Sequence, residues 1–467
     1  MREKNYEQYK RLFRFAEALV VMNIVGISFA LTWYEILNPL MNEKRDAFNN
    51  KGNLLMIAVY LALAWVFIKV FGGFEVGFYK KVNSILSQLL AMFCVNVIVS
   101  VQVILMIGGL YYIPEVIGVF AGLTAFEVLI MSLTTLLFDS LYVHLFPAWK
   151  MLLIYENDSY KEFLRKISTR KDKYEIKEAV DIAIGYEKIK EKINAYDAVL
   201  IYDVNSELRN SIVKYCYGEE IRVYQTPKIS DILIRSAGDH HLFDTPLLMS
   251  KNIGLSFEQK LCKRLIDLIF SAVMLIVTSP IMLVTAIIIK CTDGGPVFFT
   301  QKRVTLHERE FKIYKFRSMI VDAEADGKAR PATADDDRIT PIGRFIRKTR
   351  IDELPQFINV LKGDMSIVGP RPERIEHVKM YTEEIPEFKF RTKVKGGITG
   401  YAQVYGKYNT TAYDKLKLDL MYIENYNIVL DFKIMLMTIK TIFVKSSTEG
   451  FSETQEHKIL QEQKESE

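Results

Sequence analysis

The stretch LIDLIFSAVMLIVTSPIMLVTAIII at residues 265–289 decides how the second half of the chain meets a membrane. It is mostly apolar, contains Ser279 and Pro280, and has cations on both sides. If it crossed the bilayer, the seven cations between residues 290 and 317 would lie outside, against the usual cytoplasmic excess of Lys and Arg. Proline removes a backbone donor and clashes with the preceding turn. We therefore expect a re-entrant membrane helix at 262–290 that breaks at Ser279 and Pro280, with a kinked complete span as the alternative.

Four further apolar stretches lie upstream, at residues 15–37, 54–71, 85–110 and 116–146. Because a bilayer core needs about 20 helical residues, we expect four transmembrane helices within residues 1–148. Positive charge before the first stretch and after the fourth favours both ends of this N-terminal bundle in the cytoplasm. Two acids within the stretches, Glu127 and Asp139, mark either a transport path or structural contacts.

The composition excludes several other classes of protein. The chain has 467 residues, 50% of them hydrophobic, and a mean hydropathy of +0.09, which is high for a water-soluble protein. Its net charge of +5 lacks the basic excess of a dedicated nucleic-acid binder. The four cysteines lie far apart, and the six histidines share no ligand spacing with them, which argues against a disulfide scaffold or a zinc finger.

Residues 149–252 have the pattern of a small Rossmann-like α/β domain, because short β-rich runs alternate with charged helical segments. A dinucleotide-binding unit needs a glycine-rich loop directly after its first strand. Here the run at 151–155 is followed by Glu-Asn-Asp-Ser, without glycine. We expect a scaffold or a dimerisation surface, and hence a possible homodimer, rather than a nucleotide site.

Residues 257–446 are expected to form a mainly α-helical domain that includes the re-entrant helix, followed by a polar tail at 447–467. Thr340 is a candidate N-cap for one helix. A second helix is expected to begin near Asp352 and to stop at Gly363.

The joint between these two helices is the candidate reaction site. Asp352 at a helix start is expected to be held ionised by the helix dipole and by nearby cations, as a nucleophile requires. Glu353 points about 100° away from it and is expected to bind Mg²⁺, which prefers hard oxygen ligands. Arg344 and Arg347 share the exposed face of the first helix. The local pattern also fits a purely structural role, in which Asp352 caps a helix and Glu353 is a first-turn acid.

An arginine between two prolines follows in Gly-Pro-Arg-Pro at residues 369–372. The prolines restrict the backbone on both sides of Arg371, and a preset guanidinium suits phosphate oxygens. A surface turn is the alternative.

Taken together, these motifs resemble the bacterial sugar transferases, which are polyprenyl-phosphate phosphoglycosyltransferases. The matching motifs are GPVFF at 295–299, QKR at 301–303, FKIYKFRSM at 311–319, DELPQ at 352–356, GPRP at 369–372 and GITG at 397–400. The four-helix bundle and the α/β domain resemble the long form of this family.

The resemblance implies a reaction in two steps. Asp352 attacks the β-phosphate of a UDP-sugar and releases UMP, and undecaprenyl phosphate then accepts the phospho-sugar from the enzyme. Glu353 helps to bind Mg²⁺, Arg347 and Arg371 engage phosphates, and Ser279-Pro280 makes the membrane helix re-entrant. The other substrate-binding candidates are cations in or near the same motifs: Lys315, Arg317, Arg344 and Lys407.

This reading places the protein in the bacterial inner (cytoplasmic) membrane as a multi-pass protein, with its catalytic domain on the cytoplasmic face. Its partners would be a UDP-sugar, undecaprenyl phosphate and the lipid bilayer, with no nucleic acid, in the first membrane step of exopolysaccharide, capsule or O-antigen synthesis. Two other classes stay open. One is a lipid-linked sugar flippase, and the other is a membrane sensor with a DNA-binding helix-turn-helix at 340–363. The recognition helix of that sensor would carry only one cation, Lys362, which fits poorly with DNA.

Overall fold

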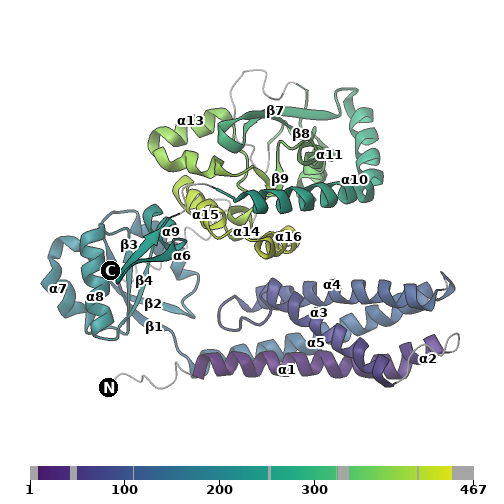
Figure 1. The fold of residues 1–467 in the computed structure, drawn as a ribbon, viewed down its shortest axis with the longest axis horizontal. Coiled ribbons are helices and arrows are strands. Elements are labelled where there is room, and N and C mark those ends of the chain that lie inside the picture. Colours follow the sequence, from purple (N-terminus) through teal and green to yellow (C-terminus); the bar gives the residue numbers. More distant parts are fainter. Residues whose placement is uncertain are drawn as a thin grey trace. The chain divides into compact units, whose positions relative to one another are not determined.

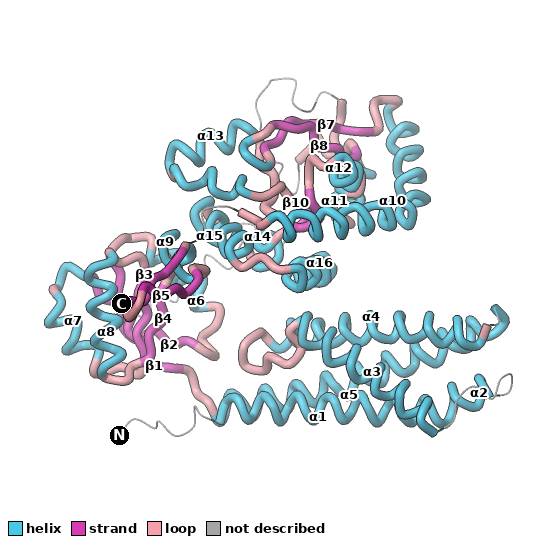
Figure 2. The backbone as a smooth tube through the Cα atoms, viewed as in Figure 1, coloured by secondary structure: helices cyan, strands magenta, loops and turns pink. Residues whose placement is uncertain are grey.

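The computed structural model describes residues 9–42, 50–108, 110–250, 254–321, 323, 336–406 and 410–443. The chain divides into two compact units, Met1–Thr226 and Pro227–Glu467. Figure 1 shows that the first unit holds a group of long helices and a small sheet, and that the second is mainly helical. Figure 2 shows that helices and loops make up most of the second unit.

Long apolar helices form the first part of the first unit, as the sequence predicts. They are α1 (Tyr9–Thr32), which continues through the π-helical turn η1 (Trp33–Leu37) into α2 (Asn38–Asn42), then α3 (Asn50–Phe71), α4 (Lys81–Ile107), the short turn η2 (Leu110–Tyr112) and α5 (Ile113–Leu145). Within the described residues, α1 and α4 each pack against α3 and α5. Five described helices are long and apolar enough to cross a membrane, four of them in this unit.

The two acids inside the apolar stretches connect these helices. Glu127 on α5 is fully buried. It accepts hydrogen bonds from Tyr60 on α3 at 2.9 Å and from Asn96 on α4 at 3.1 Å. Asp139 forms an ion pair with Lys81 at 3.3 Å. Each acid therefore has a partner on another helix and helps to hold the helices together.

The remainder of the first unit is an α/β domain with a four-stranded parallel sheet in the order β2-β1-β3-β4. The strands are β1 (Trp149–Tyr155), β2 (Tyr174–Asp181), β3 (Ala198–Tyr202) and β4 (Arg222–Gln225). Apolar residues of α6 (Tyr160–Ser168) pack on one face of the sheet, and those of α7 (Tyr186–Ile193) and α8 (Ser206–Gly218) pack on the other. The predicted mixed α/β domain is therefore present.

At the carboxyl end of β1, a carboxylate stands where a nucleotide-binding fold would have glycine. Glu156 accepts a hydrogen bond from the backbone N–H of Asn205 at 2.6 Å, so a protein carboxylate uses the α8 N-cap region.

The second unit starts earlier than the sequence suggests, because it includes α9 (Ile229–Arg235) and the hairpin of β5 (Gly238–Leu242) and β6 (Thr245–Met249). The sequence pattern predicts that the α/β domain extends to residue 252, whereas the second unit begins at Pro227. In the structure, α9 packs against α15 (Ala412–Glu424), and Ser236 donates a hydrogen bond to Glu424 at 2.8 Å.

The long helix α10 (Phe257–Asp293) contains the stretch at 265–289. Ser256 caps its start in a capping box with Gln259. The α-helical pattern continues through Pro280, but the ribbon changes direction along the helix (Figure 1). The Ser279 hydroxyl donates to the carbonyl of Ile276 at 2.8 Å. A proline within the helix and hydroxyls bonded to its carbonyls are recognised causes of such a bend.

The rest of the second unit packs around one apolar core. The antiparallel pair β7 (Phe298–Val304) and β8 (Glu310–Phe316) is followed by α11 (Pro341–Lys348), η5 (Ile351–Glu353), α12 (Gln356–Lys362), β9 (Ser366–Val368), α13 (Ile375–Glu384), η6 (Pro386–Lys393), β10 (Gly397–Thr399), α14 (Tyr401–Tyr405), α15 and α16 (Ile428–Phe443). Met365, Phe388 and Leu416 are among its fully buried members. The domain is mainly helical, as expected.

Charged side chains on the first half of α10 fix it to this core. Asp267 accepts hydrogen bonds from the Ser366 hydroxyl and the Ile367 backbone N–H on β9, both at 3.0 Å. Lys263 forms a buried ion pair with Asp431 on α16 at 2.6 Å. The membrane helix is therefore joined to the soluble core through buried polar contacts as well as by the chain.

Candidate active site

One buried amide holds the active-site segment against the β7–β8 hairpin. Asn359 on α12 is completely buried. Its side chain accepts a hydrogen bond from the backbone N–H of Tyr314 at 2.9 Å and donates one to the carbonyl of Lys312 at 2.8 Å. Because both partners lie on β8, these bonds fix α12 and the preceding turn beside Lys315.

The carboxylates lie on a turn of their own. The sequence predicts that a helix begins near Asp352, but α12 begins at Gln356, and Asp352 lies in the separate 3₁₀ turn η5. Arg350, directly before η5, has a φ of 59°, the left-handed region that non-glycine residues seldom adopt. This turn follows α11, whose N-cap is Thr340 as predicted. Asp352 is buried, and the side chain of Glu353 is only 12% exposed.

Two cations hold Glu353 through one carboxylate oxygen. Lys315 on β8 lies 2.9 Å from Oε1, and Arg371 in the turn after β9 lies 2.7 Å from the same atom. Burial alone would raise the pKa of Glu353, but Arg371 and Lys315 outweigh burial and hold it well below its usual range. Burial in turn lowers the pKa of Lys315. Glu353 is therefore a stable carboxylate anion.

Asp352 has a different environment. Its side chain is only 9% exposed, and its Oδ1 is buried without a hydrogen-bond partner in the described structure. Burial raises the pKa of Asp352, and the charge of Glu353 raises it further. Lys315 and two arginines, Arg350 and Arg347, oppose this effect without overcoming it. Burial therefore opposes the predicted effect of the helix dipole and the cations, and the pKa of Asp352 is raised overall.

The four remaining predicted cations differ in their surroundings. Arg347 lies close enough to Asp352 to act on its charge, whereas Arg344 is exposed on α11. Arg317 is 7% exposed, and its guanidinium is bonded to Asp293 at the end of α10. Lys407 lies outside the described residues. The structure thus brings together Lys315, Arg347 and Arg371 with the two carboxylates.

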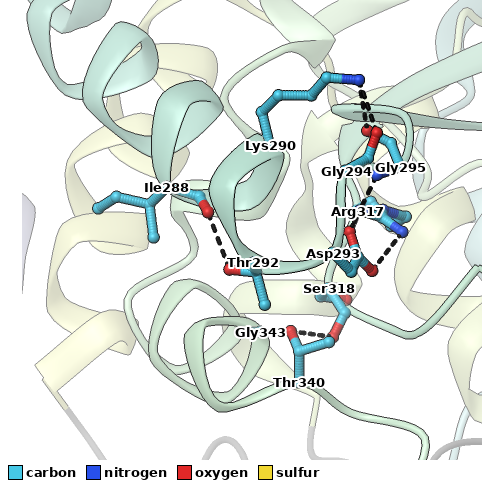
Figure 3. A network of polar contacts seen from close by, with 10 residues as sticks. All are labelled: Ile288, Lys290, Thr292, Asp293, Gly294, Gly295, Arg317, Ser318, Thr340 and Gly343. Atoms are coloured by element: carbon cyan, nitrogen blue, oxygen red, sulfur yellow. Dashed lines mark hydrogen bonds and ion pairs between the residues drawn. The ribbon is translucent and has the colours of Figure 1, made fainter.

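The contact of Arg317 belongs to a polar network where α10 ends (Figure 3). Arg317 donates through both terminal nitrogens to Asp293, one of them at 2.8 Å, and the pKa of Asp293 is lowered by this contact. Lys290 donates to the carbonyl of Gly294 at 2.6 Å. Gly294 ends the helix at a φ of 71°. Arg317 therefore fixes the end of the membrane helix to β8.

Sequence reasoning missed the residues that support Arg371. Arg391 donates to the backbone carbonyl of Arg371 at 3.0 Å and is itself held by the buried Asp419 at 2.7 Å. Arg303 on β7 is a further, half-buried cation near Arg371, and burial, followed by repulsion from Arg371, lowers its pKa to about 10. Arg303 belongs to the QKR motif, which was the signal in the sequence, but its burial is not visible there.

The site also suits a divalent cation bound together with a ligand. Among the described residues, no group of three or more His, Cys, Asp or Glu side chains forms a complete metal site. Mg²⁺, however, is commonly held by one or two carboxylates together with substrate phosphates. Asp352 and Glu353 supply adjacent carboxylates, and Oδ1 of Asp352 is buried without a partner. The donor set therefore fits Mg²⁺ bound with a phosphorylated ligand.

Fold and site together define a membrane protein whose mainly helical domain carries a buried carboxylate pair among cations. Comparisons with known proteins agree with this class. A family model described as bacterial sugar transferase matches residues 258–445. The Bacillus subtilis protein described as "Uncharacterized sugar transferase EpsL" is 42% identical over 192 residues, which are 41% of this chain and 91% of the relative.

Two longer relatives carry more specific descriptions. A UDP-N-acetylgalactosamine-undecaprenyl-phosphate N-acetylgalactosaminephosphotransferase of Aeromonas hydrophila is 40% identical over 253 residues, 53% of this chain and 59% of the relative. A UDP-glucose:undecaprenyl-phosphate glucose-1-phosphate transferase of Klebsiella pneumoniae is 39% identical over 256 residues, 54% of this chain and 53% of the relative. The chain thus spans somewhat more than half the length of these two relatives. It belongs to the bacterial sugar transferase family.

Proposed function

We propose that this protein transfers a sugar 1-phosphate from a UDP-sugar to undecaprenyl phosphate in the bacterial inner membrane and releases UMP. The observation that carries the proposal is the buried Asp352, whose Oδ1 has no partner, beside a Glu353 that two cations keep ionised. The descriptions of the Aeromonas and Klebsiella relatives support the same reaction. The product, undecaprenyl-diphosphate-sugar, would start a cell-surface polysaccharide.

In the first step, Oδ1 of ionised Asp352 attacks the β-phosphorus of the UDP-sugar. The bond from this phosphorus to the bridging oxygen breaks, and its electron pair leaves with UMP. In the second step, a phosphate oxygen of undecaprenyl phosphate attacks the same phosphorus. The bond to Asp352 breaks, and the carboxylate is restored. The unpartnered oxygen suits this role because no protein hydrogen bond has to be given up before attack.

The surrounding side chains position and stabilise the phosphates. Arg371, which Arg391 holds through its backbone carbonyl, presents a guanidinium beside Glu353. Lys315 and Arg347 add positive charge near Asp352, where the negative charge of the reacting phosphates would gather. Glu353 would hold Mg²⁺ together with the substrate phosphates, and the ion would neutralise diphosphate charge when it is bound.

Both substrates have to reach one site at the membrane surface. We infer that α10 is re-entrant, so that the end at Asp293 returns to the cytoplasmic face on which the helix began. The bend of the helix supports this inference, as do the contacts that fix both of its ends to the same compact domain, through Asp267 and through Arg317. The site would then face the cytoplasm, where the UDP-sugar is dissolved, and lie beside the leaflet that holds the lipid acceptor.

The proposal is tested with purified full-length protein in lipid nanodiscs. A panel of UDP-sugars is supplied with undecaprenyl phosphate and Mg²⁺, and UMP release is measured. We expect one or a few donors to release UMP. We expect Asp352→Asn to abolish both UMP release and the covalent label from a donor labelled in its β-phosphate, whereas Asp337→Asn, at an exposed acid, leaves both unchanged. Label on another side chain, or UMP release by Asp352→Asn, would refute the assignment.

The division of roles between the two acids needs a separate variant. Glu353→Gln keeps the size of the side chain but removes the charge that Lys315 and Arg371 contact. We expect it to reduce the rate and to raise the Mg²⁺ concentration needed for half-maximal rate. If Glu353→Gln still shows the Mg²⁺ dependence of the wild type, Glu353 does not hold the metal.

A further inference from the structure

A cavity of about 250 Å³ lies inside the first unit, far along the chain from the carboxylate pair. Its wall is formed by the start of α1, the end of α5, the turn after α3, and the α/β domain at β1, β4 and the turn before β2. One water needs only about 10–15 Å³ of such space. The cavity therefore has room for a small polar group rather than for a single water.

The lining of this cavity carries an excess of positive charge. Its charged members are Lys10, Arg14, Lys173, Arg222, Asp139 and Asp172. Both carboxylates already pair with cations outside the lining, Asp139 with Lys81 at 3.3 Å and Asp172 with Arg170 at 3.0 Å. The lining thus carries four cations against two acids, and both acids also pair with cations outside it. An anion in the cavity would lower the repulsion among these cations.

Two of these cations show the cost of this excess directly. The Nε of Arg14 is buried and has no hydrogen-bond partner in the described structure. Burial, followed by repulsion from Arg170 and Arg14, lowers the pKa of Lys173 to about 8. A bound anion would supply an acceptor for the Arg14 Nε and add negative charge beside Lys173.

Aromatic rings hold the same cations in place. The Lys10 ammonium lies 5.0 Å from the centre of the Trp149 ring, and the Arg222 guanidinium lies 5.0 Å from it as well. Lys173 lies 4.2 Å from the centre of the Phe78 ring. Cation–π contacts of this kind restrict where the charges can move, so the cations are already positioned before a ligand arrives.

We propose that this cavity is a binding site for a phosphate group, either the head group of an anionic phospholipid or free phosphate. The charge excess, the unpartnered Arg14 nitrogen and the fixed positions of the cations all select an anion with several acceptor oxygens. The cavity lies where apolar α1 begins and α5 ends, which is the depth of the head groups, and aromatic residues are typical of that depth. The site is independent of the proposed transfer reaction.

Binding is tested on the full-length protein after delipidation in detergent. Phosphatidylglycerol, phosphatidylcholine or sodium phosphate is added, and bound adducts are measured by native mass spectrometry. We expect phosphatidylglycerol to bind more tightly than phosphatidylcholine. Binding of sodium phosphate with equal affinity would identify free phosphate as the ligand. Equal binding of the two lipids together with no binding of phosphate would overturn the proposal.

Variants locate the site. The double variant Arg14→Gln, Lys173→Gln removes two lining cations. We expect its affinity for phosphatidylglycerol to fall about 25-fold, at about fivefold for each cation near a membrane surface. Lys188→Gln is the matched control, because Lys188 is exposed on α7 and does not line the cavity. Undiminished binding by the double variant would refute the assignment.

A measurement on the wild type does not depend on how the variants fold. At pH 8, Lys173 should react with acetic anhydride faster than ordinary lysines, because much of its amine is neutral. If a bound anion raises this pKa by one unit, the neutral fraction of the amine at pH 8 falls from about one half to about one tenth, so we expect protection of about fivefold or more. If phosphatidylglycerol or phosphate binds and the acetylation rate of Lys173 does not change, the anion binds elsewhere and the proposal fails.

Discussion

Replacing Asn359 with alanine tests whether one buried amide holds the active-site turn in place. The change removes the acceptor for the Tyr314 N–H and the donor to the Lys312 carbonyl. An unsatisfied buried polar group costs about 1–3 kcal/mol, and both backbone groups lie on a strand that water partly reaches, so we take the lower end, about 2 kcal/mol for the pair. Alanine returns about 0.5 kcal/mol as the better helix former, which leaves a net loss of about 1.5 kcal/mol.

Thermal unfolding of the purified protein measures this loss. For a domain of this size, 1 kcal/mol shifts Tm by about 2–4 °C, so we expect Tm to fall by about 3–6 °C. We also expect UMP release to fall by about 10- to 100-fold, because the η5 turn then loosens from Lys315 and the reacting groups lose their alignment. Asn425→Ala, at an exposed helix end, is the control and should change neither quantity.

Asn359→Asp separates the two hydrogen bonds. An aspartate still accepts from the Tyr314 N–H, but it places a negative charge against the Lys312 carbonyl, so it should also be destabilising. The reasoning fails if Asn359→Ala lowers Tm by less than about 1 °C, or if Asn359→Asp equals the wild type in both assays.

Three further predictions concern the site, the first turn of α11 and the α/β domain. Arg347→Gln removes a cation that lowers the pKa of Asp352, so the acid limb of a pH–rate profile for UMP release should move to higher pH; an unmoved limb would contradict the assigned proximity. Gly343→Ala places a methyl group against the Ser318 carbonyl and should destabilise the protein by about 1–3 kcal/mol in thermal unfolding, whereas an unchanged Tm would show that α11 can shift without cost. Folding lowers the pKa of Lys173, so between pH 8 and 10 the unfolded chain keeps a proton that the folded chain has released. The free energy of unfolding should therefore rise with pH across this window, and Lys173→Gln should flatten the rise.

Local signals in the sequence predicted local structure well. Thr340 caps α11 by accepting from the Gly343 N–H at 3.0 Å, and Gly363 ends α12 in the left-handed conformation, as their residue types indicate. The long apolar stretches are helices, and the alternation of strands and helices yields a parallel sheet. Each of these features depends on side chains within a few residues of one another, which is why the pattern was sufficient.

The electrostatics of the site were less predictable, because they depend on burial and on distant partners. The sequence predicts cations beside Asp352 and Glu353, and the structure places Lys315 and Arg371 there, but only the packed structure shows that burial raises the pKa of Asp352. Arg317 was assigned to substrate, whereas its guanidinium bonds Asp293, 24 residues earlier in the chain. Nothing in the local pattern around Arg317 indicates that contact.

Two buried polar residues carried a signal that was available but was not used. Asn359 interrupts the apolar residues of α12, and Asp267 is the one acid in the apolar stretch 265–289. A polar group at such a position needs a partner, because burying it unpaired costs several kcal/mol. Both residues prove to bond backbone atoms of a strand, Asn359 on β8 and Asp267 on β9.

The contacts of Asp267 and Lys263 decide whether α10 can be removed from the protein. The helix α10 supplies the hydrogen-bond partner of the Ile367 N–H on β9 and the ion-pair partner of Asp431 on α16. Deleting α10 to obtain a water-soluble version would therefore leave these buried polar groups without partners. Because these contacts lie inside the core, we expect the second unit to need α10 in order to fold.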